Sequence, residues 1–382
     1  MDEKKTIKLI GSGWGCSSFL KNIDTNKYDV CVISNNLYFI YTPLLAYQTT
    51  HSINTLQHIS NINPHIKYNK NTVTNVDFKN NTIITNNSKE KYDYLILCHG
   101  ANVNTFNING VSTYTHFLKT YKDVLNIKKE LSKLKKNSNI AIIGCGPTGT
   151  EMVGNLLDYN KFNIYAIDGL SRPLNMYSEK ISNYVVNIWK KNNVNLYFNN
   201  FVNKIDNKNI YFKNNKINYD MVIWCGGIKT NSLTNNINKQ LNNDCRFGIP
   251  VTPYLNVIHN LPYKNYFNYI YYLIFTHNFK NYTNNIYAIG DCAYSKNPPT
   301  AQIASQQGKY LADNFNNDFK NIKPFKLENK GQICYIGNKK SVYELNTFTS
   351  SGNLTYYANK FIHIYNAINQ HQSINFIRDL FR

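Results

Sequence analysis

The chain has 382 residues, of which 42% are hydrophobic, so it has the composition of a globular protein and room for two or more domains. Its 42 Lys and Arg residues outnumber 22 Asp and Glu, and the net charge of +20 favours an anionic partner such as a membrane surface or a nucleic acid. The eight cysteines show neither C-x-x-C nor C-x-x-x-x-C spacing, which excludes zinc ribbons and locally spaced dithiol sites.

Targeting and membrane-spanning signals are absent from the sequence pattern. The first strand begins near Thr6 with no apolar segment before it, and no run of 18 apolar residues follows, so we expect neither a signal peptide nor a transmembrane helix. The lysines are dispersed, and their densest stretch, residues 128–136, includes Glu130 and is typical of an exposed helix face. Nucleic-acid binding is therefore disfavoured, and an anionic membrane is the preferred partner.

The first element in chain order is a strand, a loop and a helix over residues 6–22. The loop reads Gly11-Ser12-Gly13-Trp14-Gly15-Cys16, and glycines before a helix start let a backbone approach a diphosphate closely. Cys16 takes the third position of the G-x-G-x-x-G pattern, where a small residue allows close helix–strand packing. The next strand, 28–34, ends at Ser34 without the usual acid, so Ser34 is the candidate ribose contact.

Further strands and a helix follow before the pattern repeats. Residues 66–86 alternate as strands around an Asn80-Asn81 turn, and residues 92–101 form a buried strand that ends in a glycine turn. A Lys-rich pattern over residues 115–136 predicts a helix.

A second nucleotide-binding pattern starts at residue 139. Gly144, Gly146 and Gly149 complete the G-x-G-x-x-G spacing around Pro147 and Thr148. The following strand ends at Asp168, in the position of an acid that holds a ribose 2′-hydroxyl, and its charge favours NADH over NADPH. The alternative for Asp168 is a solvated acid at a strand end.

The rest of the chain repeats the strand pattern of the first domain and then returns to that domain. A helix is expected at 179–191 and a hairpin region at 195–216. Residues 219–227 repeat the pattern of 92–101, an internal repeat that indicates two related α/β domains. After Gly248 the chain returns to the first domain, with a strand at 284–293 and a helix containing Gln302 and Gln306. We expect an α/β fold of two Rossmann-like dinucleotide-binding domains with a C-terminal amphipathic helical tail.

Six motifs in this order resemble a known family, the type II NADH:quinone oxidoreductases, or single-subunit alternative NADH dehydrogenases, with the fungal and plant branch most similar. The resemblance spans about residues 7–337. Its motifs are the first loop, Tyr41-Thr42-Pro43-Leu44-Leu45, the second loop, Leu174-Asn175-Met176, Ala288-Ile289-Gly290-Asp291 and Pro298-Pro299-Thr300-Ala301-Gln302.

The resemblance implies two cofactors and a set of site residues. FAD would bind at the first loop and NADH at the second, with Glu151 near the nicotinamide and Gln302 and Gln306 lining a quinone pocket. The implied FAD contacts are Gly11, Ser12, Gly13, Trp14, Gly15, Ser34, Thr42, Pro43, Gly290 and Asp291. The implied NADH contacts are Gly144, Gly146, Pro147, Thr148, Gly149, Asp168 and Gly226.

The implied activity is a non-electrogenic one that uses no metal. Hydride would pass from NADH to the flavin, and two electrons would then pass to a membrane quinone without proton pumping. The corresponding domains are 1–115 and 248–322 for FAD, 116–247 for NADH, and 323–382 for membrane association or dimerisation. The implied location is peripheral, on a cytoplasmic or mitochondrial inner-membrane face.

Three departures from the family pattern keep alternatives open. Asn155 replaces the glutamate of a G-E-L motif, Asn35 and Asn36 replace a usual Pro-Arg pair, and residues 259–282 form an aromatic-rich insertion. The alternatives are a ferredoxin-reductase or apoptosis-factor-like NAD(P)H flavoprotein, and a catalytically weak flavoprotein that acts as a binding module.

The C-terminal tail combines apolar and basic residues in the manner of an amphipathic membrane anchor. Docking on the protein's own core, or on a second subunit in a homodimer, is the alternative. The apolar residues are Phe361, Ile362, Ile364, Tyr365, Ile368, Phe376, Ile377, Leu380 and Phe381, with Lys360, Arg378 and Arg382 between them.

Overall fold

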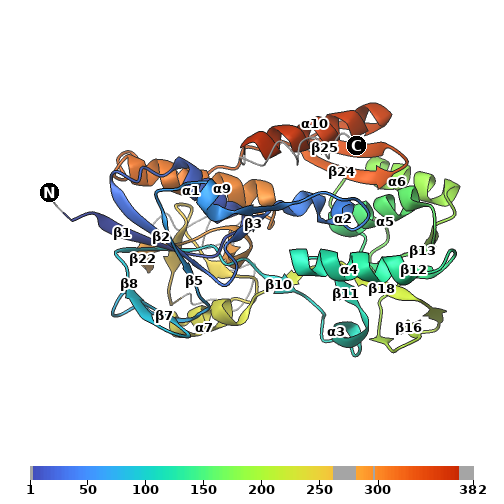
Figure 1. Ribbon diagram of the computed structural model, residues 1–382, viewed down its shortest axis with the longest axis horizontal. Coiled ribbons are helices and arrows are strands. Elements are labelled where there is room, and N and C mark those ends of the chain that lie inside the picture. Colours follow the sequence, from blue (N-terminus) through green and yellow to red (C-terminus); the bar gives the residue numbers. More distant parts are fainter. Residues whose placement is uncertain (1–2, 261–280, 296, 370–382) are drawn as a thin grey trace. The chain divides into compact units, whose positions relative to one another are not determined.

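The computed structural model describes residues 3–260, 281–295 and 297–369, and their contacts divide the chain into two compact units (Figure 1). Unit 1 comprises Met1–Phe39, Gln57–Asn102 and Lys229–Glu328, and unit 2 comprises Ile40–Leu56, Val103–Ile228 and Asn329–Arg382. The expected aromatic core of the insertion, residues 266–275, and the tail residues 376–382 lie outside the described residues.

Unit 1 is built on a six-stranded sheet in the order β21-β22-β9-β1-β2-β5, in which only the β21–β22 pair is antiparallel. The central strand β1 buries Ile7 and Leu9 completely, as expected for a parallel strand covered on both faces. The strands are β1 (Lys5–Ile10), β2 (Tyr28–Ser34), β5 (Lys67–Lys70), β9 (Tyr94–Leu97), β21 (Asn256–Ile258) and β22 (Tyr282–Ala288).

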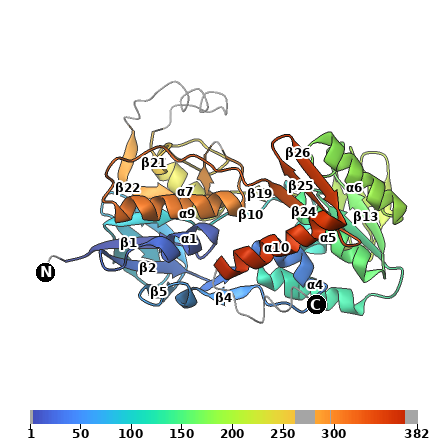
Figure 2. The same cartoon turned by 90° about the horizontal axis from the view of Figure 1, so that it is seen from above.

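Helices α1 (Trp14–Asn22) and α9 (Ala301–Asn316) lie side by side in unit 1 (Figure 2). They cross closely because Gly308 faces Gly15: a Cβ atom at Gly308 would lie 2.2 Å from the Gly15 carbonyl oxygen. Unit 1 also contains the antiparallel sheet β6 (Val73–Asp77), β7 (Thr82–Thr85) and β8 (Lys89–Lys91), and helix α7 (Ser232–Gln240) packs on β6.

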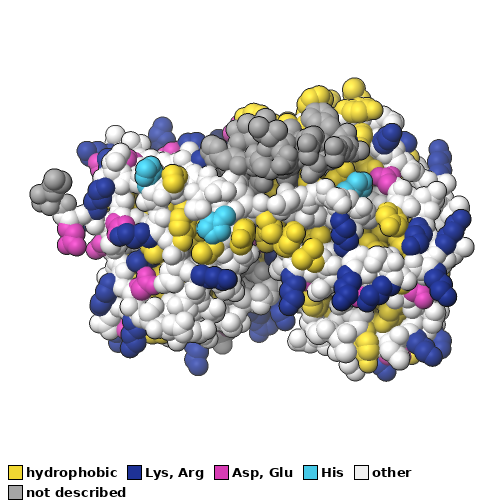
Figure 3. Space-filling view, in the orientation of Figure 1, with side chains coloured by type: hydrophobic (Ala, Val, Ile, Leu, Met, Phe, Trp, Pro, Cys, Tyr) yellow, Lys and Arg dark blue, Asp and Glu magenta, His cyan; other side chains and the backbone are white. Residues whose placement is uncertain are grey.

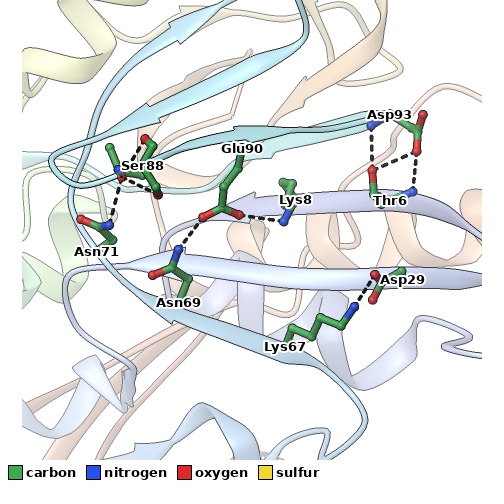
Figure 4. A network of polar contacts seen from close by, with 10 residues as sticks. Thr6, Lys8, Asp29, Lys67, Asn69, Asn71, Ser88, Glu90 and Asp93 are labelled. Atoms are coloured by element: carbon green, nitrogen blue, oxygen red, sulfur yellow. Dashed lines mark hydrogen bonds and ion pairs between the residues drawn. The ribbon is translucent and has the colours of Figure 1, made fainter.

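A polar network joins this antiparallel sheet to the parallel one (Figure 4). Lys8 Nζ on β1 lies 2.8 Å from Glu90 Oε2 on β8, and Asn69 on β5 donates to the other oxygen of the same carboxylate. The two charged side chains are only 15% and 20% exposed. Removing either partner would leave a largely buried charge, so the pair holds the two sheets in one arrangement.

Unit 2 has a five-stranded parallel sheet in the order β11-β18-β12-β13-β14. Side chains alternate along β12: Ile140 and Ile142 face a core that includes the helices, whereas Ala141 and Ile143 face a three-stranded sheet. The elements are β11 (His116–Phe117), α4 (Tyr121–Lys133), β12 (Asn139–Ile143), α5 (Pro147–Tyr159), β13 (Asn163–Ile167), α6 (Glu179–Lys191), β14 (Asn195–Tyr197), β15 (Lys204–Ile205), β16 (Asn209–Tyr211), β17 (Lys216–Asn218) and β18 (Met221–Trp224).

The C-terminal segment is an integral part of unit 2. Strand β24 (Gln332–Gly337) packs on α5, where a Cβ atom at Gly154 would lie 2.6 Å from the Gly337 nitrogen. β25 (Lys340–Leu345) and β26 (Phe348–Gly352) extend this sheet, and α10 (Asn353–Asn369) packs on it. The remaining short elements are β3 (Tyr38–Ile40), α2 (Leu45–Gln48), β4 (Leu56–His58), β10 (Asn102–Val103), α3 (Val111–Tyr114), β19 (Ile228–Lys229), β20 (Ile249–Pro250), β23 (Ala293–Tyr294), and the 3₁₀ turns Thr42–Leu44, Ile59–Asn61 and Gly290–Cys292.

The fold class is confirmed, but the unit boundaries differ from the expected domain boundaries. The chain passes between units near residues 102 and 228, rather than at 115 and 247. Asn104 belongs with unit 2 because its amide donates to the Gly227 oxygen and its carbonyl accepts from the Trp224 indole. Residues 40–56 and 329–382 also join unit 2, instead of the first FAD segment and a separate tail.

Two local predictions name the right kind of structure but have the wrong bounds. The helix expected at 115–136 is the short strand β11 followed by α4, which begins after Thr120 because Thr120 and Asp123 form a reciprocal capping box. The region 195–216 does not begin with a hairpin, because β14 pairs parallel with β13, and the antiparallel pairs come later, between β15, β16 and β17.

Candidate functional site

The first glycine loop of unit 1 turns sharply between β1 and α1. Gly11 has a φ of +117°, and a Cβ atom there would lie 2.4 Å from the Cys98 oxygen, so only glycine fits. A Cβ atom at Gly13, by contrast, would meet none of the described residues within 4 Å, and α1 begins after Gly13 without a side-chain cap from them. Open space in front of an uncapped helix start suits a phosphate group, as the motif predicts.

Ser12 and Ser34 tie this loop to the end of β2. The Ser12 hydroxyl donates to the Asn36 oxygen at 2.6 Å, and the Ser34 hydroxyl donates to Ser12 Oγ at 3.5 Å and accepts from the Asn36 amide. Trp14, the first residue of α1, stacks edge-on against Phe39 with ring centroids 5.0 Å apart. These contacts fix the loop, and Ser34 is the last residue of β2, the strand next to β1.

The Gly290–Asp291 turn lies next to the first loop and depends on a residue that sequence reasoning missed. Gly290 has a φ of +69°, and its amide donates to Gln307 Oε1 at 2.8 Å. Gln307 is 1% exposed and lies on α9, one position after the expected Gln306. The sequence offered no sign of this role, because Gln307 lies outside the Gln302 and Gln306 pattern and has no motif of its own.

Gln307→Leu is expected to lower the free energy of unfolding by about 1–3 kcal/mol, because the leucine leaves the Gly290 amide without its partner. Thermal or urea unfolding measures this, with retained flavin per protein as a second readout. Gln332→Leu, at an exposed strand position, is the matched control and should change stability by less than about 0.5 kcal/mol. Equal stability of both variants would contradict the role of Gln307.

The expected quinone-site glutamines lie on the first turns of α9, both half-buried, with Thr300 capping the helix. The Gln306 side chain donates to the Glu328 oxygen and accepts from the Glu328 amide, both at 2.9 Å. Gln306 thus holds the segment before β24 against α9. The two residues are 22 positions apart, so the spacing of Gln302 and Gln306 did not predict this contact.

The second glycine loop, in unit 2, has all three glycines of the G-x-G-x-x-G pattern, whereas the first loop has Cys16 in the third position. Gly144 has a φ of +94°, and a Cβ atom at Gly149 would lie 1.8 Å from the Gly144 oxygen. A Cβ atom at Gly146 would likewise meet no described residue within 4 Å. Helix α5 begins after Gly146 with Pro147 in its first turn and without a side-chain cap from that part of the chain. The exposed Thr148 follows. The loop therefore offers a second place for a diphosphate.

Asp168 lies beside this loop, and backbone amides hold both of its carboxylate oxygens. Its Oδ2 accepts from the Cys145 amide at 2.6 Å, and its Oδ1 accepts from the Leu170 amide at 2.8 Å. A carboxylate has further lone pairs, so the fixed group can still accept from ribose hydroxyls. Gly226 follows β18, the strand next to β12 in the sheet. Gly226 lies against the Trp224 indole, and a Cβ atom there would be 2.7 Å from the ring.

On helix α5, the carboxyl of Glu151 has the pKa that is shifted most strongly toward the neutral form. Burial raises the pKa of its carboxyl from 4.5 to about 8, although a hydrogen bond from the Tyr335 amide opposes the shift. Glu151 is therefore mainly protonated at neutral pH. Asn155, one turn later, is 1% exposed; its amide donates to the Glu151 carbonyl at 2.7 Å, and its Oδ1 has no hydrogen-bond partner among the described residues.

Thr42 and Pro43 lie in a 3₁₀ turn of unit 2, and the preceding residue links that turn to α10. Tyr41 is fully buried, with its hydroxyl 3.2 Å from His363 Nδ1 on α10. Burial raises the pKa of Tyr41 and lowers the pKa of His363 to about 4, so both groups are neutral at physiological pH. The turn that the motif placed near a flavin is thus fastened to the C-terminal helix.

Comparisons with known proteins match most of the chain. The pyridine nucleotide-disulphide oxidoreductase family model matches residues 5–261. A probable NADH dehydrogenase of Dictyostelium discoideum is 27% identical over 401 residues, covering 92% of this chain and 83% of that protein. The external alternative NADH-ubiquinone oxidoreductase of Yarrowia lipolytica, a mitochondrial protein, is 25% identical over 461 residues, covering 93% and 75%.

One solved structure matches almost the whole chain. The NDH2 of Plasmodium falciparum in complex with NADH superposes with a TM-score of 0.86 at 25% sequence identity, covering 99% of this chain and 97% of that one. The sulfide:quinone oxidoreductase of Aquifex aeolicus has a TM-score of 0.75 at 15% identity and shares the fold.

Proposed function

The chain belongs to the pyridine nucleotide-disulphide oxidoreductase family, and on this premise we propose that it is a type II NADH dehydrogenase, which passes electrons from NADH through FAD to a quinone. The observation that carries the proposal is the pair of glycine loops at uncapped helix starts, with the fixed Asp168 carboxylate beside the second. When bound, the flavin supplies hydride acceptance and electron transfer.

The chain's own residues position the ligands and set the local charge. The first loop would bind the FAD diphosphate and the second loop the NADH diphosphate. Asp168 would accept from the ribose hydroxyls of NADH and repel the 2′-phosphate of NADPH. Glu151, protonated at neutral pH, would supply a proton close to the reacting groups, because its raised pKa lies near the working pH.

Gln302 and Gln306 would line the quinone site from the start of α9. Both lie on the same face of the helix, four residues apart, so that their amides can hydrogen-bond one ligand. Gln306 would have a second task there, since it also fixes the backbone of Glu328.

A catalytically weak flavoprotein is the second candidate, and Asn155 favours it. A buried amide stands where the family pattern has a carboxylate, and its oxygen has no hydrogen-bond partner in the described part of the chain. The proposed enzyme, reconstituted with FAD, should oxidise NADH continuously when a short-chain quinone is added. A protein that binds FAD and is reduced by NADH but is not reoxidised by quinone would favour the weak flavoprotein, and a protein that retains no FAD would contradict both.

Membrane contact through α10 is part of the proposal, because this helix turns its polar face inward. Thr355, Asn359 and His363 are buried and hydrogen-bond Ser350, Ser341 and Tyr41. The outward face carries large apolar side chains at helical spacing: Leu354 (83% exposed), Tyr357 (54%), Phe361 (64%) and Tyr365 (68%). Hydrophobic side chains stand out at the edge where α10 runs (Figure 3).

An interfacial position is consistent with the other observations. The net charge of +20 attracts the chain to anionic lipid. Among the residues that the structure describes, no helix combines the length and the hydropathy needed to cross a membrane. Because the Yarrowia relative is mitochondrial, we propose a peripheral position at the inner mitochondrial membrane for this chain.

Phe361→Ser combined with Tyr365→Ser is expected to weaken binding to anionic vesicles by at least about tenfold, since burial of one such ring contributes about 1.5–3 kcal/mol. Vesicle co-sedimentation measures this. Phe247→Ser, which removes an equally exposed ring from unit 1, should leave binding unchanged. Unaltered binding of the double variant would contradict the membrane contact, and loss of a dimer instead would assign α10 to subunit association.

A further inference from the structure

The strand order of unit 2 fixes where the far end of NADH would lie. A dinucleotide crosses the carboxyl ends of parallel strands. Its diphosphate would lie at the loop after β12, and its adenosine ribose at Asp168 after β13. The next strand in the sheet is β14, so the adenine would lie over the loop that follows β14.

That loop is clamped to the segment containing Asp168. The Asn199 amide donates to the Leu170 oxygen at 2.9 Å, and the Asn200 amide donates to the Asp168 oxygen at 3.0 Å. Asn199 has a φ of +57°, which redirects the chain directly after the strand. The two loops therefore form one rigid platform at this edge of the sheet.

Phe201 presents an exposed aromatic ring on this platform. This large apolar residue is 70% exposed and belongs to neither hydrophobic core of unit 2 among the described residues. The ring rests on the backbone of Gly169: a Cβ atom at Gly169 would lie 2.5 Å from Cε1 and 2.7 Å from Cδ1 of Phe201. Glycine at position 169 thus lets the ring lie against the residue that directly follows Asp168, and the next residue, Leu170, is also exposed and apolar.

We propose that Phe201, seated on Gly169, is the stacking surface for the adenine of NADH, an inference that rests on the proposed function. An adenine has a π-face for such stacking, and a ring held by its own loop needs little ordering when the ligand binds. Phe201 then acts on NADH binding and not on hydride transfer.

The test compares Phe201→Ala with the unaltered FAD-loaded protein in titrations with ADP-ribose, which carries the adenine, ribose and diphosphate but no nicotinamide. The dissociation constant for ADP-ribose should rise by roughly 5- to 100-fold, the range expected for one lost base–aromatic stack. Phe201→Trp should bind ADP-ribose as the unaltered protein does. Phe348→Ala, which removes an equally exposed ring of unit 2, should change nothing.

A second substrate separates this role from a general loss of structure. Reduced nicotinamide mononucleotide lacks the adenosine half, so Phe201→Ala should oxidise it at the unaltered rate while the KM for NADH rises and kcat stays constant. Equal affinity of Phe201→Ala and the unaltered protein for ADP-ribose, or a parallel loss with the mononucleotide, would overturn the assignment of Phe201. If the unaltered protein bound neither ADP-ribose nor NADH, the proposed function itself would fail, and the inference with it.

Discussion

Replacing Glu151 with glutamine is expected to lower NADH:quinone turnover by roughly 10²- to 10⁴-fold, the usual contribution of a positioned general acid or base. Burial holds the pKa of this carboxyl at about 8, so the group carries its proton at neutral pH and can release it without a large driving force. Glutamine has nearly the same shape but cannot release a proton. Binding of FAD and of ADP-ribose should therefore remain unchanged.

The pH dependence gives this prediction a second readout. The pKa of Glu151 is raised in the folded state, so between 4.5 and about 8 the folded protein holds a proton that the unfolded chain releases. The stability contributed by this proton is complete below 4.5 and is lost as the pH rises through about 8. Glu151→Gln should remove this loss, and its melting temperature relative to the unaltered protein should increase from pH 5 to pH 9.

Glu179→Gln is the matched control, because Glu179 is an exposed acid at the start of α6. It should change neither turnover nor the pH dependence of melting. Turnover of Glu151→Gln within about threefold of the unaltered enzyme would contradict a role for Glu151 in proton transfer. An unchanged pH profile of stability would contradict its burial as a neutral acid.

Two alanine substitutions in the second glycine loop are expected to separate ligand binding from folding. A Cβ atom at Gly146 would meet no atom of residues 3–260, 281–295 or 297–369 within 4 Å, and the backbone of Gly146 is extended, so Gly146→Ala should fold with nearly unchanged stability. The methyl group would occupy the place of the NADH diphosphate. Loss of one or two hydrogen bonds to a charged group should weaken NADH binding by about 10- to 100-fold.

Gly149→Ala should affect both properties. Its Cβ atom would lie 1.8 Å from the Gly144 oxygen, a backbone atom that cannot move without shifting the loop. Such overpacking costs about 1–3 kcal/mol or more. Thermal unfolding and NADH titration of the two variants measure the difference. Normal NADH affinity in a folded Gly146→Ala protein would contradict placement of the diphosphate at this loop.

The sequence predicted the parts of the fold that local patterns specify. The glycine spacing around Gly144 and the acid at Asp168 are set by chain geometry within about 25 residues, and the structure has the turn, the helix and the fixed carboxylate where that spacing predicts them. The strand at 28–34 follows from its apolar run in the same way. Whether these loops bind NADH and FAD through the named residues remains a prediction that the substitutions above test.

The parts that the sequence did not predict depend on contacts between distant residues. Residues 40–56 join unit 2 because Leu45 and Ala46 pack in the core of that unit. The role of Gln307 depends on a glycine 17 residues earlier. The apolar spacing of Phe361 and Tyr365 predicts a helix, but only the hydrogen bonds of Asn359 and His363 show that the polar face is the buried one.

A stopped-flow experiment that follows the flavin absorbance tests the central claim most directly. The FAD-loaded protein should lose this absorbance when mixed with NADH and recover it when a short-chain quinone is added, with NADPH much less effective because of Asp168. Absorbance that NADH does not bleach, or that returns no faster with quinone than in air alone, would contradict electron transfer from NADH through FAD to a quinone.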